Sequence, residues 1–501
     1  MRIHHLALVL AAVSGTVASA PPLVAQTPAP VVVPAPGNVL TLPDAITLAR
    51  RNNPIYQAAG NARRTAAATL RAANGAFLPN MNTSFTTGFR EGRQTFFQGQ
   101  SFGAANDQLS TDVGANAQMN LSLATFAERR SARAIAEATE ADISGAEQRV
   151  RTDVTTQYLL ALQAQARSVL QDTLLTTTGA QLQLARARFQ VGSATQLDVQ
   201  RAEVADGQQR VAALIARNQV AIEIIRLFQQ IGIPPVPDAR LDPNLPPLPA
   251  VELANILEQA LKSNPQLDAL RFREEAARRG VASARSSYYP SLSLSANVSA
   301  FTNRVTDIGQ LITSGQSSTL NQRANCIRNE EVRARVGLPN QLAQCELIAF
   351  TPQLEAQIRD GQGKYPFDFT RNPYGLSASL SLPVFNGFRR EQQVEQANVQ
   401  RRNAQIDVRA QELRLNADVT TSLLLLTTAQ QTVALQEQNV RTARTALALA
   451  QERYRVGQIS LVELVQARSD FERAETDRIT AVYDVQRAFT ALEAAVGRPL
   501  R

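Results

Sequence analysis

Four segments of the chain alternate apolar and polar residues with a period of two. In residues 80–89, for example, Met81, Phe85 and Phe89 alternate with asparagine, serine and glycine. This period is typical of a β-strand with one apolar and one polar face. We predict two β-hairpins, at 80–123 and 291–384. Their strands of about ten residues are long enough to cross a bilayer at a tilt.

Long helical patterns follow both predicted hairpins. Residues 128–190 and 388–455 contain no proline, and alanine, leucine, glutamine, arginine and glutamate dominate them. At 1.5 Å per residue each helix would be about 95 to 100 Å long. Such helices suit a tube that crosses a wide compartment better than the core of a compact domain. Shorter helical patterns, at 43–74 and 251–286, precede the hairpins.

The same order of patterns occurs twice, and short motifs recur with it. Asn53-Pro54 returns as Asn264-Pro265, and the Arg-Phe-Gln-Val-Gly motif that ends at Gly192 returns as Arg-Tyr-Arg-Val-Gly ending at Gly457. We infer an internal duplication. The predicted domains are a first repeat at 26–250, with hairpin 80–123 and helical hairpin 127–231, and a second repeat at 251–501, with hairpin 291–384, a long loop insertion at 302–373 and helical hairpin 386–496.

The first 25 residues predict an export signal. Arg2 supplies the positive end, Leu6 begins a short apolar core, and small residues before Ala20 form a cleavage pattern. Pro21 would hinder cleavage directly after Ala20, so cleavage after Ala25 is a competing prediction. No other stretch has about 18 uncharged apolar residues, so we expect no membrane-spanning helix in the mature chain.

Composition excludes several kinds of chemistry. Both histidines, His4 and His5, lie in the predicted signal, so the mature chain would have no imidazole for catalysis or metal binding. The net charge of +8 comes from arginines interleaved with acids, which does not predict nucleic-acid binding. Cys326 and Cys345 predict a disulfide in an oxidising compartment, and metal binding by two cysteines is the weaker alternative. We predict no catalytic, cofactor or metal site.

Four strands cannot form a stable open sheet in lipid. Their two edges would expose unpaired backbone groups, at several kcal/mol each. Two chains would supply eight strands, a barrel filled by its own side chains, whereas three would supply twelve and a water-filled lumen. A trimer is therefore the smallest assembly expected to conduct. A soluble sandwich is the alternative, but long helical stretches separate its few strands.

Both long helices are predicted to end at a tight turn. Gly192 and Gly457 permit a left-handed helix cap. Thr195 with Asp198, and Ser460 with Glu463, then form capping-box patterns that start the next helix. One interpretation is that the two acids only cap their helices, and the other is that they also cluster at the end of a tube and help to close it.

With these features, the mature chain resembles the TolC family of outer-membrane efflux channels. The motifs that carry the resemblance are the two turns, at 189–200 and 454–464. The resemblance implies an α+β membrane protein: a trimeric twelve-stranded transmembrane β-barrel, four strands per chain, continuous with a long α-helical periplasmic barrel. It also implies that Val191, Gly192, Val456 and Gly457 contact a periplasmic adaptor (membrane fusion) protein, which couples the duct to an inner-membrane pump.

The resemblance also assigns a periplasmic gate. Asp198 and Tyr454 fall on positions that bond across neighbouring helices to hold the tunnel mouth shut, and Glu463 falls on an acidic position that narrows it. This sequence departs from the best-known member at Ile459, where a gate arginine is expected, and at Gln466, which replaces an acid. The gate should therefore be held by fewer charged contacts.

The expected function is a passive outer-membrane exit duct of a tripartite efflux or type I secretion system, in contact with lipid and not with nucleic acid. The chain has no GxxxxGK[ST] loop, so energy would come from a partner. A periplasmic coiled-coil scaffold is the main alternative. An envelope hydrolase is a weaker one, because no nucleophile-elbow motif is present. Drugs, metal ions, siderophores and polypeptides all remain open as cargo.

Overall fold

The computed structural model describes residues 39–92, 95–97, 100–102, 107–236, 239–245, 247–249, 253–339, 341–363 and 365–500. The predicted signal peptide at 1–25 lies outside these residues. The described residues form two compact units: the first comprises 39–66, 135–274 and 404–500, and the second comprises 67–134 and 275–403, apart from the gaps above. Among the helices in this part of the chain, none is long and apolar enough to span a membrane.

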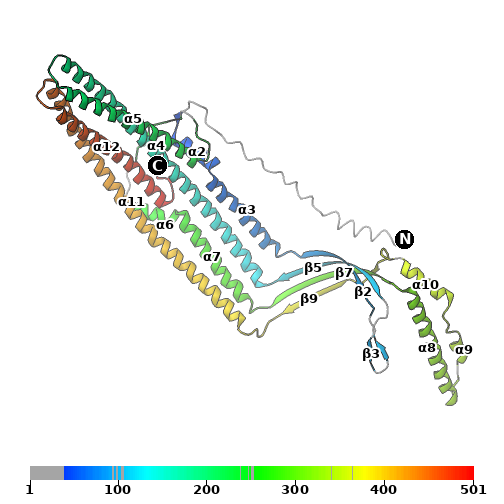
Figure 1. Cartoon of the computed structure of the whole chain (residues 1–501). Helices are drawn as coiled ribbons and strands as arrows, with labels where there is room; N and C mark the ends of the chain where they lie inside the picture. The colour runs from blue at the N-terminus through cyan, green and yellow to red at the C-terminus, as the bar shows by residue number, and fades with distance from the viewer. Residues whose placement is uncertain are drawn as a thin grey trace. The chain divides into compact units, whose positions relative to one another are not determined.

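The helices recur in the same order and with nearly the same lengths (Figure 1). A short helix, a 22-residue helix, a very long helix and a 36-residue helix come first. Their counterparts follow in the second repeat, and the very long helices have 68 and 67 residues. The bounds are α2 Leu42–Asn52, α3 Pro54–Gly75, α4 Leu123–Gln190 and α5 Gln196–Ile231, then α6 Leu253–Ser263, α7 Pro265–Ser286, α11 Arg389–Arg455 and α12 Leu461–Val496.

Each predicted short helix is in fact two helices, because a proline interrupts it. Pro54 and Pro265 lack a backbone N–H, and the residue before a proline is driven out of the helical region. Asn53 accordingly has an extended backbone, with φ −64° and ψ 122°. Its side-chain oxygen accepts hydrogen bonds from the backbone N–H groups of Ile55 and Tyr56, at 2.9 and 3.2 Å, and so starts α3.

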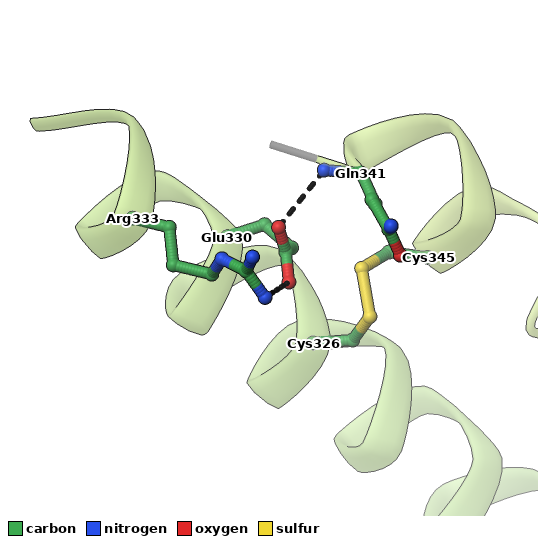
Figure 2. The surroundings of a disulfide bond; sticks show 5 residues. All are labelled: Cys326, Glu330, Arg333, Gln341 and Cys345. Carbon is green, nitrogen blue, oxygen red and sulfur yellow. Dashed lines mark hydrogen bonds and ion pairs between the residues drawn. A yellow bond between two sulfur atoms is a disulfide. The ribbon is translucent and has the colours of Figure 1, made fainter. Parts of the chain in front are cut away.

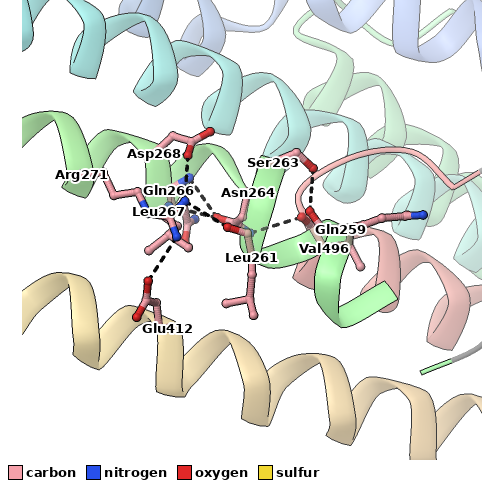
Figure 3. Close-up of polar contacts among 10 residues, drawn as sticks. All are labelled: Gln259, Leu261, Ser263, Asn264, Gln266, Leu267, Asp268, Arg271, Glu412 and Val496. Carbon is pink, nitrogen blue, oxygen red and sulfur yellow. Dashed lines mark hydrogen bonds and ion pairs between the residues drawn. The ribbon is translucent and has the colours of Figure 1, made fainter. Parts of the chain in front are cut away.

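The interrupted helices are tied to the ends of the 36-residue helices. Asn264 Nδ2 donates to the carbonyl of Ala495 at 3.1 Å. It also lies 3.4 Å from the carbonyl of Val496, while Asn264 Oδ1 accepts from the backbone N–H groups of Gln266 and Leu267 (Figure 3). Asn53 Nδ2 makes the matching bond to the carbonyl of Gln230 at 2.7 Å. The recurring Asn-Pro motif thus starts one helix and holds the end of another.

The second unit contains the sheet. Its strands are β2 Asn80–Arg90, β5 Gln108–Leu121, β7 Ser291–Val305 and β9 Gly375–Ser381, which pair antiparallel in the order β2-β5-β7-β9. The two-residue β8 Thr370–Arg371 also pairs with β7, and β3 Thr95–Phe97 pairs with β4 Gln100–Phe102. In the first unit, β1 Val39–Leu40 pairs parallel with β6 Arg240–Leu241.

The strand register places the apolar positions together. Phe85 lies opposite Val113, which lies opposite Ala300 on the next strand. Leu292 lies between Leu121 and Leu380 in the same way. Directly opposite residues share a face of the sheet. One face is therefore mainly apolar and the other is rich in serine and asparagine, as the period of two predicted.

The described residues of the insertion predicted as a long loop contain three helices, so that description was incomplete. β7 continues to Val305, and α8 Ile308–Arg335, α9 Leu342–Glu346 and α10 Pro352–Gly363 follow. Cys326 and Cys345 form a disulfide between α8 and α9 (Figure 2). Beside it, Glu330 accepts a hydrogen bond from the Gln341 backbone N–H at 2.8 Å. The α8 segment has helical sequence but weak amphipathic periodicity, which explains why the pattern alone did not reveal it.

Candidate functional site

The two tip turns, defined here as residues 191–195 and 456–460, have the same backbone geometry. Gly192 and Gly457 adopt φ +74° and +80°, which only glycine adopts without strain. Gly192 N donates to the carbonyl of Phe189, and Gly457 N donates to the carbonyl of Tyr454, both at 3.0 Å. These bonds end α4 and α11 and allow α5 and α12 to fold back.

The predicted capping boxes are present. The Asp198 carboxylate accepts from the backbone N–H of Thr195 at 3.0 Å, and the Thr195 hydroxyl accepts from the Asp198 N–H at 3.2 Å. Ser460 and Glu463 make the same reciprocal pair, at 3.3 Å in both directions. The hydrogen bonds from the Thr195 backbone and then its hydroxyl lower the pKa of Asp198. Both acids therefore start a helix in this chain.

Tyr454 lies between the two helical hairpins. Its side chain is 5% exposed and belongs to an apolar cluster with residues of α4, α5 and α12. The guanidinium carbon of Arg188, at the end of α4, lies 4.9 Å from the centre of the Tyr454 ring. Arg188 Nη2 also donates to the carbonyl of Arg455. Arg188 thus joins the end of α4 to the end of α11 by a cation–π contact and a hydrogen bond.

The two departures from the family pattern have clear structural consequences. Ile459 packs against the cluster that holds Tyr454, so an apolar contact occupies the position of the expected gate arginine. Gln466 Nε2 donates to Asp470 Oδ1 at 2.9 Å, within α12. Val191 and Val456 project from the tip turns, with 77% and 59% of their surface exposed. The tip turns therefore expose apolar side chains at their surface.

Sequence reasoning missed Arg188 and Arg468. Arg188 is the first residue of the Arg-Phe-Gln-Val-Gly motif, so the sequence drew attention to its position. Its partner Tyr454 lies 266 positions further along the chain, so the sequence did not reveal the contact. Arg468 is one arginine among many on α12, and only packing shows that it is buried. Among the described residues, no three acidic, cysteine or histidine side chains are grouped to hold a metal ion.

The polar face of the sheet is a second candidate site. Ser295 Oγ lies 2.6 Å from Ser377 Oγ across β7 and β9, and Ser293 Oγ donates to Asn120 Oδ1 at 2.7 Å across β7 and β5. The polar face therefore carries cross-strand pairs of small neutral side chains. Such a surface can line a water-filled space without strong charge selection.

A sheet with one apolar and one polar face, together with long helices joined by tight turns, is typical of an outer-membrane channel. The comparisons with known proteins support this class of protein. The chain matches the outer membrane efflux protein family over residues 45–233, 256–325 and 330–498. This match covers most of its length, so the chain belongs to that family of channels. As a member of this family, it is an outer-membrane protein. The family assignment made from the tip turns is confirmed.

Individual relatives are distant. The outer membrane efflux protein BepC of Brucella suis biovar 1 (strain 1330) is 23% identical over 343 residues, 68% of this chain and 61% of BepC, so the match spans less than two thirds of that protein. Crystal structures of a Pseudomonas aeruginosa membrane protein and of Vibrio cholerae VceC have TM-scores of 0.68 and 0.67. Their sequences are 17% and 16% identical to this chain, respectively. The alignments cover 91% and 92% of this chain, and 90% and 97% of the two structures.

Proposed function

We propose that the protein is a trimeric exit duct of a tripartite efflux or type I secretion system. In this assembly, three four-stranded sheets close into one twelve-stranded transmembrane barrel, and the long helices form a periplasmic barrel continuous with it. The two repeats of each chain, derived from a duplication, supply equivalent parts. Substrate passes through without chemical change, and an inner-membrane pump supplies the energy.

One observation carries this proposal: the sheet has a mainly apolar face and two edges. Among the described strands, β2 pairs with β5 alone and β9 with β7 alone. Open edges are not tolerated in hydrocarbon, because unpaired N–H and C=O groups there cost several kcal/mol each. Pairing β2 of one copy with β9 of the next removes both edges around a closed ring.

Exposed apolar stripes on the helices support the same assembly. Ile406, Leu413, Leu424 and Leu435 on α11 are exposed and follow one another at intervals of 7 and 11 residues, which places them on one face. Further from the tip turns, the exposed apolar residues of α5 include Val211, Leu214, Ile215 and Ile225. In the proposed trimer, α5 of one copy covers the α11 stripe of the next, and a helical tube results.

The proposed adaptor contact lies in the tip turns, and the proposed periplasmic gate lies in the helix ends beside them. Asp198, Tyr454 and Glu463 are the gate residues, and Arg188 joins them because it links α4 to α11 in the closed arrangement. Val191, Gly192, Val456 and Gly457 contact a periplasmic adaptor. Opening separates the hairpins when the adaptor binds the open arrangement more tightly than the closed one.

The test is reconstitution of the full chain in planar lipid bilayers, together with mass measurement in detergent. We expect a trimer with a small closed-state conductance. A trimer that resists extraction without detergent but conducts no ions would refute the duct. A water-soluble assembly with no β-sheet signal would instead support the periplasmic scaffold.

A further inference from the structure

A groove runs along α5 and α12 beside the tip turns. Its rim carries the side chains of Leu197, Val204 and Val462, which are between 52% and 60% exposed. Its lining also includes Leu461 and Arg468, which are both buried. Exposed apolar side chains gathered around a groove are typical of a binding surface, and a buried cation inside it is unusual.

Arg468 is a buried cation whose hydrogen-bonding groups are incompletely satisfied among the described residues. Its side chain is 8% exposed, and its Nε and Nη1 atoms are buried without a hydrogen-bond partner in the described part of the chain. Burial lowers the pKa of its guanidinium, although the charge of Glu472 opposes that shift. Arginine nevertheless stays charged in proteins, so it cannot escape the cost of burial by losing its proton.

The first repeat shows how this position can be satisfied. The residue that corresponds to Arg468 there is Glu203, which pairs with Arg186 of α4 at 2.7 Å. The residue that corresponds to Arg186 in the second repeat is Gln451, which cannot supply the opposite charge. The two repeats therefore differ at this point, and the buried cation that lines the groove comes from α12, in the second repeat.

The groove lining also has a defined spacing. Leu461, Val465 and Arg468 stand at positions i, i+4 and i+7 of α12, so they lie on one face of that helix. A helix placed along the groove would meet the apolar positions first and the guanidinium about 10 Å further on, two turns away. Such a helix matches the groove if it carries an apolar side chain and a carboxylate two turns apart.

We propose that this groove binds a helix of a periplasmic partner protein and that Arg468 selects it through a carboxylate. The carboxylate forms a charge-assisted hydrogen-bonded pair with the guanidinium, and the apolar side chain covers Leu461 and Val465. This inference rests on the proposed function, which brings a partner to the tip turns, and it adds the residue and the chemistry of recognition.

The first experiment identifies what occupies the groove. Benzoylphenylalanine replaces Val204 in the full chain, cells are irradiated, and the cross-linked peptide is sequenced by mass spectrometry. We expect a helical segment of a periplasmic protein with aspartate or glutamate within two turns of the linked residue. Cross-links mainly to a second copy of this chain, to a segment without an acid, or to nothing would overturn the proposal.

The second experiment tests the charge pair. A synthetic peptide that copies the linked segment should bind the purified trimer, and Arg468→Met should raise its Kd at least about thirtyfold, the lower end for truncating a buried charge pair. Arg468→Lys should recover part of the loss. Arg473→Met, an exposed change on the same helix, is the matched control and should leave Kd unchanged.

A charge-free version of the peptide completes the cycle. When its acid is changed to the amide, the peptide should bind the wild type and Arg468→Met with equal affinity. If Arg468→Met weakened the binding of both peptides equally, the proposal would be overturned. Arg468→Met should still give conducting trimers. If wild-type trimers did not conduct, the proposed exit-duct function would be rejected. The peptide-binding result would still test the groove proposal separately.

Discussion

At the scale of single residues, the ends of α4 and α11 are joined through an arginine and an aromatic ring. Arg188 stacks on Tyr454 and bonds to the carbonyl of Arg455, whereas the Asp198 carboxylate accepts hydrogen bonds from Thr195. Ile459 lies in the apolar cluster around the ring. Near the tip turns, the two hairpins contact each other through this stacking, apolar packing and the Arg188 hydrogen bond, whereas the Asp198 carboxylate bonds within its own helix.

Arg188→Gln should raise the closed-state conductance in planar bilayers, because it removes a cation–π contact of about 0.5 to 2 kcal/mol. Tyr454→Leu should do the same, while Tyr454→Phe keeps the ring and should stay closed. Arg186→Gln is the control, since Arg186 pairs with Glu203 on α5. Opening by Tyr454→Phe equal to that by Tyr454→Leu would show that the hydroxyl, not the ring, holds the tip shut.

The pKa of Asp198 predicts how the start of α5 responds to acid. The folded pKa is lowered, so Asp198 stabilises this turn fully above its unfolded pKa of about 3.9 and loses the effect as pH falls through the folded value. Amide hydrogen exchange in 196–200, corrected for intrinsic rates, should report the loss. Asp198→Asn should weaken the turn at neutral pH and abolish its dependence on acid; an unchanged dependence would exclude this carboxylate as the cause.

At the scale of elements, the ends of α5 and α12 are constrained by close backbone approach. Gly232 has φ +86°, and a Cβ there would lie 2.6 Å from the carbonyl oxygen of Asn52. Gly497 has φ +85°, and its Cβ would lie 2.7 Å from Pro265 Cδ. Each glycine allows a 36-residue helix to end against the Asn-Pro motif, which is how the two repeats position their shorter helices.

Gly232→Ala should lower the free energy of unfolding by about 2 to 4 kcal/mol, from the left-handed backbone and the overpacking together. Gly207→Ala on the same helix should raise it by about 0.5 to 1 kcal/mol, because a Cβ there meets nothing within 4 Å. Thermal unfolding followed by circular dichroism compares the two. A neutral Gly232→Ala would mean that the Asn52 backbone moves away at little cost.

At the scale of the whole molecule, the single chain leaves two kinds of surface that a neighbour would cover. These are the edges of the sheet and the apolar stripe of α11. The proposed three-fold assembly would cover both, because each copy has two sheet edges and exposed apolar stripes on α5 and α11. The membrane part and the helical part would therefore assemble together.

Leu435→Asp should lower the temperature at which the trimer dissociates, since it removes about 1.5 to 3 kcal/mol of apolar burial per copy and places a charge in the proposed interface. Native mass spectrometry after heating measures the dissociation. Gln430→Asp lies about 140° around the same helix and is the control. Equal stability of both variants would place the Leu435 face outside the interface.

The sequence by itself determined the features that neighbouring residues encode. The period of two predicted both faces of the sheet, and glycine with the capping motifs predicted the tip turns, because these depend on residues a few positions apart. Only the tertiary structure decided that Arg188 meets Tyr454, that Gly232 meets Asn52, and that Arg468 is buried. These contacts join residues far apart in the chain, so they follow from how the helices pack and not from any local pattern.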